Sequence, residues 1–194
     1  MEVVNSYCTS AVNGTLSSLH KAYHDTQYGF KAINDNELFG SLILEINQAG
    51  LSWDTILNKK DSIRKAYADF NIEAIAAFTD DDIETLMGDP GIIRMRGKIT
   101  AIIHNANQIL TLQKIAGSFE NWLNENHPLD VDEWIKLFKT IFKFTGKEIT
   151  KEFLMGNGYL EGAHEKGCPI YEKNHSSAPL MVCKKVLVPF LMIG

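Results

Sequence analysis

The sequence predicts an all-α protein, because apolar residues recur at helical spacing along most of its 194 residues and strand-like alternation is scarce. Cap residues precede several of these periodic segments, and glycine follows some of them. No internal repeat, low-complexity tract or obvious linker interrupts the chain. This length is sufficient for one sizeable hydrophobic core.

The clearest helix is predicted within residues 34–50, NDNELFGSLILEINQAG. Its apolar residues follow i, i+3, i+4, i+7 spacing: Phe39, Leu42, Ile43 and Ile46. Asn34 with Glu37 resembles a capping box, and Gly50 is a plausible end. A second helix, rich in Lys and Arg, is expected around 58–69, so that Trp53 lies just past the end of the first.

Further helices are predicted along the rest of the chain. The segment TDDDIETLMGD (79–89) has a cap at Thr79 or Asp80. The segment ITAIIHNANQILTLQKIAG (99–117) carries one apolar stripe: Ile99, Ile102, Ile103, Ala106 and Ile109. Three more helices are expected at 118–126, 131–143 and 147–155.

Composition is that of an ordinary soluble globular protein, with 45% hydrophobic and 22% charged residues. The net charge of −5 weighs against a nucleic-acid partner, although a local basic patch can act inside an acidic whole. No signal-peptide pattern is present, and no apolar run approaches the roughly 20 residues that span a bilayer. Three cysteines (Cys8, Cys168 and Cys183) indicate a reducing cytoplasm rather than a disulfide scaffold.

Glu45 lies inside an otherwise apolar run, LILEINQAGLSW (42–53). At 100° per residue it falls on the border of the buried stripe, so its carboxylate points partly inward and needs a partner. Together with Tyr23, Tyr28 and Trp53, it suits a flat cationic ligand held by stacking, cation–π attraction and charge pairing. The alternative is a core tryptophan and a glutamate that bonds to backbone or to a tyrosine hydroxyl.

The stretch PGIIRMRGK (90–98) connects two amphipathic helices. Gly91 and Gly97 lack a Cβ, so the backbone can approach another object closely. Basic side chains accompany the amides at the start of the following helix: Arg94, Arg96 and Lys98. This combination suits a phosphate group, and the alternative is a plain turn with solvated arginines.

Potential metal ligands occur near both ends of the chain. Cys8 precedes His24, and His164 precedes Cys168 in an H-x3-C arrangement. A Cys–His pair from each end would form a tetrahedral site suited to zinc. Four protein ligands leave no open position, so such a metal would be structural and would close a very long loop. On spacing alone, such widely separated Cys and His residues are more often unconnected.

A row of lysines, Lys136, Lys139 and Lys143, lies on one side of the segment KLFKTIFKFTGKEITK (136–151). Such a row is typical of the solvated side of a helix. A phosphate-facing strip is the alternative.

Five segments in this order resemble the DNA-3-methyladenine glycosylase I family. They are AYHDTQYG (22–29), LEINQAGLSW (44–53), DPGIIRMRGKITAIIHNA (89–106), FKFTG (142–146) and GAHEKGC (162–168). The resemblance runs from about Cys8 to Cys168. It implies an all-α helix–hairpin–helix DNA glycosylase fold: a core over 31–144, a zinc-stapled annex from 1–30 and 145–175, and a tail of unknown role over 176–194.

The resemblance also assigns roles by position. The implied structural zinc ligands are Cys8, His24, His164 and Cys168. The implied DNA-binding residues are Gly91, Ile92, Arg94, Arg96, Gly97 and Lys98. The implied residues around a flipped base are Tyr23, Tyr28, Glu45 and Trp53, with Glu45 the catalytic residue.

The implied activity is base-excision repair: hydrolysis of the N-glycosidic bond of 3-methyladenine in alkylated double-stranded DNA, after base flipping. We expect a cytoplasmic monomer that releases free 3-methyladenine and does not bind membranes. Tyr28 stands where the family usually has tryptophan, and "CTS" replaces Cys-Gly-Trp. These departures and the acidic charge motivate an alternative, a non-catalytic or degenerate protein that binds alkylated DNA. A zinc-dependent hydrolase would need an open metal position, which four ligands do not leave.

Overall fold

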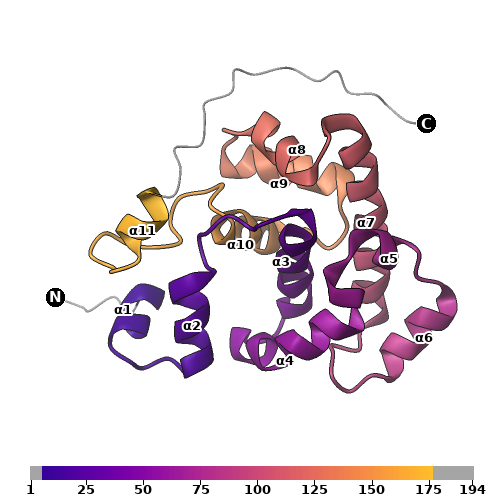
Figure 1. The fold of residues 1–194 in the computed structure, drawn as a ribbon, viewed down its shortest axis with the longest axis horizontal. Helices are drawn as coiled ribbons and strands as arrows, with labels where there is room; N and C mark the ends of the chain where they lie inside the picture. The colour runs from indigo at the N-terminus through magenta and orange to yellow at the C-terminus, as the bar shows by residue number, and fades with distance from the viewer. Residues whose placement is uncertain (1–5, 177–194) are drawn as a thin grey trace.

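The structure is a computed structural model that describes residues 6–176, and all regular secondary structure in this range is helical (Figure 1). The helices are α1 (Tyr7–Val12), α2 (Ser18–Thr26), α3 (Asp35–Gln48), α4 (Trp53–Ala66), the 3-10 turn η1 (Ala68–Phe70), α5 (Ile72–Ala76), α6 (Asp80–Gly88), α7 (Arg96–Ala116), α8 (Phe119–Asn126), α9 (Val131–Ile141), α10 (Lys147–Gly156) and α11 (Tyr171–Ser176). The all-α prediction is therefore confirmed for the described residues. The expected tail, including Cys183, lies outside them from residue 177 onward.

Side-chain caps explain where several helices begin. Thr79 and Asp82 form a full capping box at α6, as do Asp130 and Glu133 at α9. The box expected at α3 is only half formed. Asn34 accepts a hydrogen bond from the Glu37 amide at 2.9 Å, but the Glu37 carboxylate turns away to pair with Arg64 of α4.

The helix expected at 58–69 begins earlier than predicted. The Ser52 hydroxyl accepts a hydrogen bond from the Thr55 amide at 3.3 Å, so α4 starts at Trp53. Trp53 is thus the first residue of α4 rather than a residue past the end of α3. The helix also ends earlier, at Ala66, before the chain turns through left-handed backbone such as Asp69 (φ 54°).

Helix α3 lies at the centre of the main core and packs against α4, α7, α8 and α10. Its predicted apolar stripe is fully buried: Phe39, Leu42, Ile43 and Ile46. Each such side chain contributes roughly 1.5–3 kcal/mol of hydrophobic burial. This packing fixes the direction in which α3 projects its remaining side chains, including Glu45.

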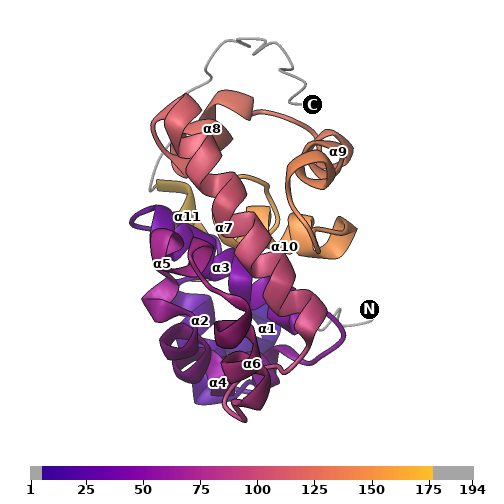
Figure 2. The same ribbon diagram turned by 90° about the vertical axis from the view of Figure 1, so that its right-hand side faces the viewer.

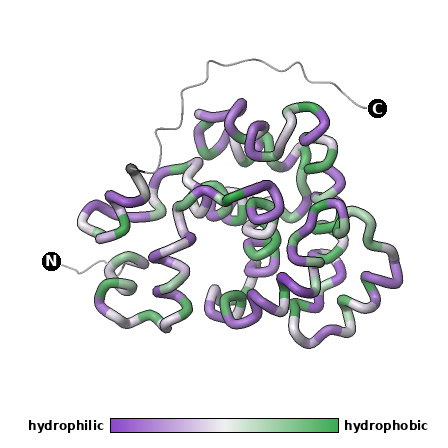
Figure 3. The backbone as a smooth tube through the Cα atoms, in the orientation of Figure 1, coloured by the Kyte–Doolittle hydropathy of each residue, from purple (hydrophilic) through white to green (hydrophobic). Residues whose placement is uncertain are grey.

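Helix α7 crosses the molecule beside α3 (Figure 2). Of its predicted stripe, Ile99, Ile102, Ala106 and Ile109 are buried, whereas Ile103 is half-buried. Polar and apolar residues alternate along the helices as amphipathic packing requires (Figure 3). Although α7 has 21 residues, none of the helices in the described range is long and apolar enough to cross a membrane.

A second, smaller cluster joins the two ends of the described chain. Helices α1, α2 and α11 lie on one side of the main body (Figure 1), where Cys8, Cys168 and Ile170 pack with Phe30. Helix α10 does not follow the division expected at residue 145. It packs against α3 and α9, and its Phe153 lies in the main core.

Candidate functional site

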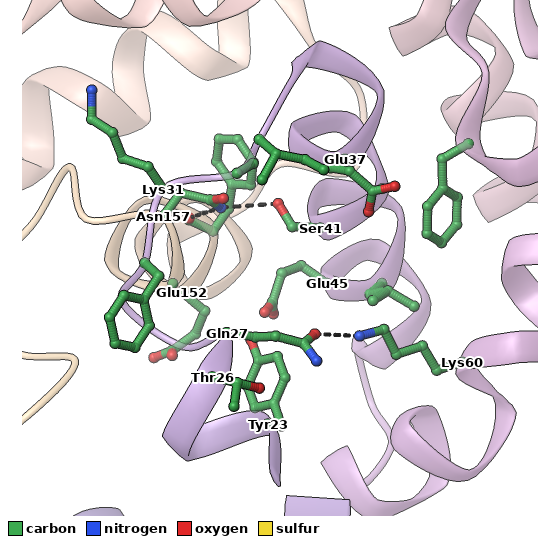
Figure 4. Close-up of a pocket in the computed structure, with 18 of the residues that line it drawn as sticks. Tyr23, Thr26, Gln27, Lys31, Glu37, Ser41, Glu45, Lys60, Glu152 and Asn157 are labelled. Carbon is green, nitrogen blue, oxygen red and sulfur yellow. Dashed lines mark hydrogen bonds between the residues drawn. The ribbon is translucent and has the colours of Figure 1, made fainter. Parts of the chain in front are cut away.

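A cavity of about 340 Å³ lies between α2, α3, α4 and α10 (Figure 4). This volume is within the range of pockets that bind small molecules. Aromatic residues form part of its wall: Tyr23, Phe30, Trp53, Phe70 and Phe153. Polar and charged residues form much of the rest: Gln27, Lys31, Glu37, Ser41, Glu45, Lys60, Arg64, Glu152 and Asn157. The cavity thus combines flat apolar surfaces with hydrogen-bonding groups.

Glu45 is the most buried charged residue of the cavity wall, with 7% of its surface exposed. Its carboxylate forms no hydrogen bond or ion pair with the residues that the structure describes. Burial, followed by the negative charge of Glu152, raises the pKa of Glu45 to about 8. A buried carboxylate without a partner opposes folding, and such groups are concentrated at ligand sites. The alternative of a glutamate satisfied by its protein neighbours therefore does not describe this residue.

Tyr23 and Trp53 form an aromatic corner beside Glu45. Their ring centroids lie 5.1 Å apart at an interplanar angle of 59°. Tyr23 comes from α2 and Trp53 from the start of α4, so the packing of α2 against α4 brings the rings together. Burial raises the pKa of Tyr23, which keeps its hydroxyl protonated at neutral pH. The corner offers faces for stacking and a hydroxyl near the carboxylate.

Tyr28 does not line the cavity, in contrast to the sequence expectation. Its hydroxyl donates a hydrogen bond to Glu152 Oε2 at 3.1 Å, so the ring stands behind the wall. Its backbone carbonyl lies 2.7 Å from His164 Nε2, on the other side. Tyr28 therefore links the cavity to the terminal Cys/His residues rather than stacking on a ligand.

Glu152 is a cavity residue that the sequence reasoning missed. It lies one position before Phe153 on α10, at the edge of that helix's buried face. The helical geometry that placed Glu45 at a border applies equally to this position. Glu152 stands in a lysine-rich segment, and a lysine row is more readily read as a solvated surface.

The opposite side of the cavity carries two basic residues of α4. Lys60 donates to the Gln27 side-chain oxygen (Figure 4), and Arg64 pairs with Glu37. The Arg64 guanidinium also lies 4.6 Å from the centroid of the Phe70 ring. Both cations therefore have partners of their own, and neither neutralises Glu45.

The four predicted metal ligands converge. Donor atoms of Cys8, His24, His164 and Cys168 all lie within 4.8 Å of one another, and all four residues are buried. His24 Nε2 is 3.5 Å from Cys8 Sγ and 3.6 Å from Cys168 Sγ. His164 Nδ1 is 3.7 Å from Cys8 Sγ and 3.8 Å from Cys168 Sγ.

These separations fit a tetrahedral metal. With metal–sulfur bonds of about 2.3 Å and metal–nitrogen bonds of about 2.0–2.1 Å, a tetrahedral nitrogen–sulfur edge is about 3.6 Å. The outer ring nitrogens also have partners. His24 Nδ1 lies 2.8 Å from Asp25 Oδ1, and His164 Nε2 bonds to the Tyr28 carbonyl. The donor set is therefore complete, oriented and suited to a metal ion.

The connection between α6 and α7 presents an open helix N-terminus. Helix α7 begins at Arg96 without a side-chain cap and without an acidic residue in its first turn. Gly91 lies in a closely packed turn, because a Cβ there would lie 2.9 Å from Asp89 Oδ1 and 3.1 Å from the Ser62 Cβ. Arg94 is exposed, and exposed Arg96 pairs with Glu84 at 2.6 Å.

The predicted phosphate contact by Lys98 is not supported. Lys98 is only 3% exposed, and its ammonium group donates to the Asn47 carbonyl at 2.8 Å and the Ala49 carbonyl at 2.7 Å. These carbonyls end α3, where a cation also interacts favourably with the helix dipole. The side chain of Ile92 is likewise buried in the core, so neither side chain faces solvent.

The row of lysines, unlike Lys98, lies on the surface. Lys136, Lys139 and Lys143 are exposed, and Lys143 lies beyond the end of α9 at Ile141. Their exposure agrees with a solvated helix surface.

Comparison with known proteins gives one consistent result. The family described as methyladenine glycosylase matches residues 13–141. DNA-3-methyladenine glycosylase 1 of Escherichia coli K12 is 35% identical over 175 residues, which cover 80% of this chain and 93% of that protein. A Staphylococcus aureus structure, described as the structural basis of 3-methyladenine recognition by 3-methyladenine DNA glycosylase I, superimposes with TM-score 0.74. It is 32% identical and covers 84% of this chain and 97% of its own.

A further structure is a tyrosine-to-phenylalanine variant of 3-methyladenine DNA glycosylase I in complex with 3-methyladenine. It superimposes with TM-score 0.73 at 32% identity, over 83% of this chain and 96% of its own. The segment matched by the family contains Tyr23, Glu45, Trp53 and the α6–α7 connection. It ends before Glu152 and before His164 and Cys168.

Proposed function

This chain belongs to the methyladenine glycosylase family, and we propose that Glu45 is the residue with which it recognises and releases an alkylated base. The chain is a DNA-3-methyladenine glycosylase, an N-glycosyl hydrolase of base-excision repair. Its substrate is DNA that contains 3-methyladenine, and its product is the free base. The observation that carries the proposed role is the buried Glu45 carboxylate, which faces the cavity without a partner.

The chemistry of the substrate explains why such a cavity is sufficient. Alkylation at N3 makes adenine cationic, which weakens its bond to deoxyribose before the enzyme acts. The enzyme must unstack the nucleotide, which costs a few kcal/mol and less for a damaged base. The Tyr23 and Trp53 rings then stack on the base, and the Glu45 carboxylate accepts hydrogen bonds from its amino edge. Water attacks the oxocarbenium-like sugar, and we assign no residue to position that water.

Charge is the basis of selectivity in this proposal. Ionised Glu45 pairs with a cationic base and offsets the cost of its own burial. Neutral adenine offers no such compensation, so its binding leaves the buried carboxylate uncompensated or protonated. The pocket therefore favours the base whose glycosidic bond is already weakened.

We propose that the α6–α7 connection is the hairpin of a helix–hairpin–helix DNA-binding motif. The uncapped start of α7 offers backbone amides to a phosphate, and Gly97 permits a close approach. Exposed Arg94 and Arg96 add positive charge at the same place. Gly91 shapes the turn, Lys98 supports it from inside, and Ile92 anchors it in the core.

We also propose that Cys8, His24, His164 and Cys168 hold one structural zinc ion. The nitrogen–sulfur separations near 3.6 Å and the partnered outer nitrogens support this assignment. Zinc would join α1 and α2 to the segment before α11. A cytoplasmic monomer with this terminal annex remains part of the proposal.

Base release from methylated DNA tests the function. The wild-type protein is expected to release 3-methyladenine, identified chromatographically, and Glu45→Gln to lower the rate by about 10²–10³-fold while remaining folded. Glu125→Gln, an exposed change on α8, is the matched control and should retain full activity.

Two outcomes would change the conclusion. Full activity of Glu45→Gln would remove Glu45 from the mechanism. Binding of lesion-containing DNA by the wild type without base release would favour the alternative of a degenerate binding protein.

A further inference from the structure

The cavity wall contains two carboxylates, supplied by helices that are distant in sequence. Glu45 projects from α3 and Glu152 from α10, and Figure 4 shows both side chains reaching into the space beside Tyr23. Helices α3 and α10 pack directly against each other, so the two acidic groups are fixed relative to one another. Their charges also interact, since Glu152 acts on Glu45 electrostatically.

Glu152 is held in place by a specific contact. The Tyr28 hydroxyl donates to its Oε2 at 3.1 Å. The Tyr28 ring is itself fixed between two others, with centroids 5.8 Å from Tyr23 and 5.6 Å from Tyr7. Oε1 of Glu152 forms no hydrogen bond with the described residues. One oxygen is thus anchored and the other remains available.

No cation in the described cavity wall balances this pair. Lys60 and Arg64 of α4 bond to Gln27 and Glu37, and Lys31 pairs with Glu120 at 3.3 Å. Two tyrosine hydroxyls also interact with Glu45 electrostatically, those of Tyr23 and Tyr28, and burial raises the pKa of both, so they are neutral at neutral pH. Two nearby carboxylates without a cation disfavour simultaneous ionisation. Burial first, and the negative charge of Glu152 second, raise the pKa of Glu45 to about 8, so in the empty cavity Glu45 keeps a proton over much of the neutral pH range.

We propose that Glu152 is a second specificity-determining residue, which acts with Glu45 to select a positively charged purine over a neutral one. This proposal rests on the proposed function in taking a purine as the ligand. A cation between the two carboxylates stabilises both ionised forms, and the proton of Glu45 leaves to solvent as the cation enters. A neutral purine of the same shape produces neither effect.

Small purines test the proposal without any need for catalysis. The permanently cationic 3,9-dimethyladeninium ion and neutral 9-methyladenine differ in charge and one methyl group, and calorimetry gives the affinity for each. Wild type is expected to prefer the cation, and Glu152→Gln to lose about tenfold of that preference, the size of one pKa unit. The glutamine carbonyl can still accept the Tyr28 hydrogen bond, so the wall should keep its shape.

Two further measurements separate a charge effect from a structural one. Glu148→Gln removes an exposed carboxylate from the same helix and should leave the preference unchanged. Calorimetry in buffers of different ionisation enthalpy counts the protons released on binding near pH 7. Wild type should release more than Glu152→Gln, because losing the Glu152 charge lets Glu45 ionise before the ligand arrives.

The outcomes distinguish this proposal from the glycosylase function. If Glu152→Gln retains the wild-type preference and proton release, Glu152 has no role in selection, even if base release is normal. A wild type without preference for the cation would overturn the proposal equally. A preference that depends on Glu152 in a protein that releases no base would support the selectivity and refute the enzymatic function.

Discussion

Two buried polar regions lie on either side of Tyr28, and they solve the problem of burying polar groups differently. In the Cys/His cluster, four donors converge at metal-binding distances, and both outer histidine nitrogens have partners. In the cavity, the Glu45 carboxylate has no partner, and a second carboxylate stands nearby. The four donors of the Cys/His cluster surround a position for a single ion, whereas the cavity leaves room for a small molecule.

The difference shows how the same protein separates permanent from exchangeable binding. In the proposed zinc site, four protein ligands would leave no position for substrate, so the energy of metal binding would contribute to folding. An open cavity with an uncompensated charge opposes folding until a complementary molecule arrives. Different sets of side chains thus serve stability and recognition. Mutations in the two regions should therefore change the free energy of unfolding in opposite directions.

The largest effect is expected when one ligand is removed from the Cys/His cluster. Cys168→Ser should remove the metal and lower the unfolding free energy by more than about 5 kcal/mol, because structural zinc binding, about 10–16 kcal/mol in small zinc domains, contributes directly to folding. Zinc content by mass spectrometry and thermal unfolding would measure this. Glu45→Gln serves as the control and should retain one zinc per chain. A Cys168→Ser protein with unchanged zinc content and melting temperature would contradict the metal assignment.

A smaller effect of the opposite sign is expected in the cavity. The pKa of Glu45 is raised from 4.5 to about 8, so the folded protein binds a proton that the unfolded chain has released between these values. Stability should therefore fall as pH rises through this window, by about 5 kcal/mol at most, at about 1.4 kcal/mol per pKa unit. Glu45→Gln should abolish that part of the slope and be more stable than wild type near pH 8.

Denaturant unfolding at several pH values between 5 and 9 provides the measurement. The informative quantity is the difference between wild type and Glu45→Gln, since other groups contribute equally to both. Parallel curves would show that Glu45 is compensated within the protein, and the contrast between the two regions would disappear.

The smallest effect is expected at Tyr28, which lies between the Cys/His cluster and the cavity. Tyr28→Phe removes the hydroxyl that holds Glu152 but retains the backbone carbonyl that contacts His164. We expect a loss of about 1–2 kcal/mol in stability and a few-fold weaker binding of a cationic purine, with unchanged zinc content. Calorimetry and zinc analysis on the same preparation would check this. A loss of zinc would show that the two regions are not independent.

The features predicted best from sequence were those decided by local geometry. Helical periodicity located the buried face of α3 and the border position of Glu45, because both depend only on the 100° step along one helix. The cap at Thr79 was likewise local. The early start of α4 was missed because Ser52 was not recognised as its cap.

Features that depend on tertiary packing were not predictable in this way. Lys98 follows two arginines and looks like a phosphate contact, but its environment depends on where α3 ends across the core. Tyr28 was expected in the cavity wall, but it follows the end of α2, and its hydroxyl meets Glu152 of α10, a contact between residues distant in sequence. The convergence of the four Cys and His residues was expected from the family resemblance, which carries information on the fold, whereas their spacing alone favoured unconnected residues.

The buried ammonium group of Lys98 makes one rigid unit of two parts with different tasks. It ties the beginning of α7, the proposed phosphate-binding end, to the end of α3, the helix that carries Glu45. The separation between the proposed phosphate-binding start of α7 and the Glu45 carboxylate is therefore fixed before DNA binds. With the phosphate held at α7 as proposed, this fixed separation would set how far a base must leave the duplex to reach Glu45.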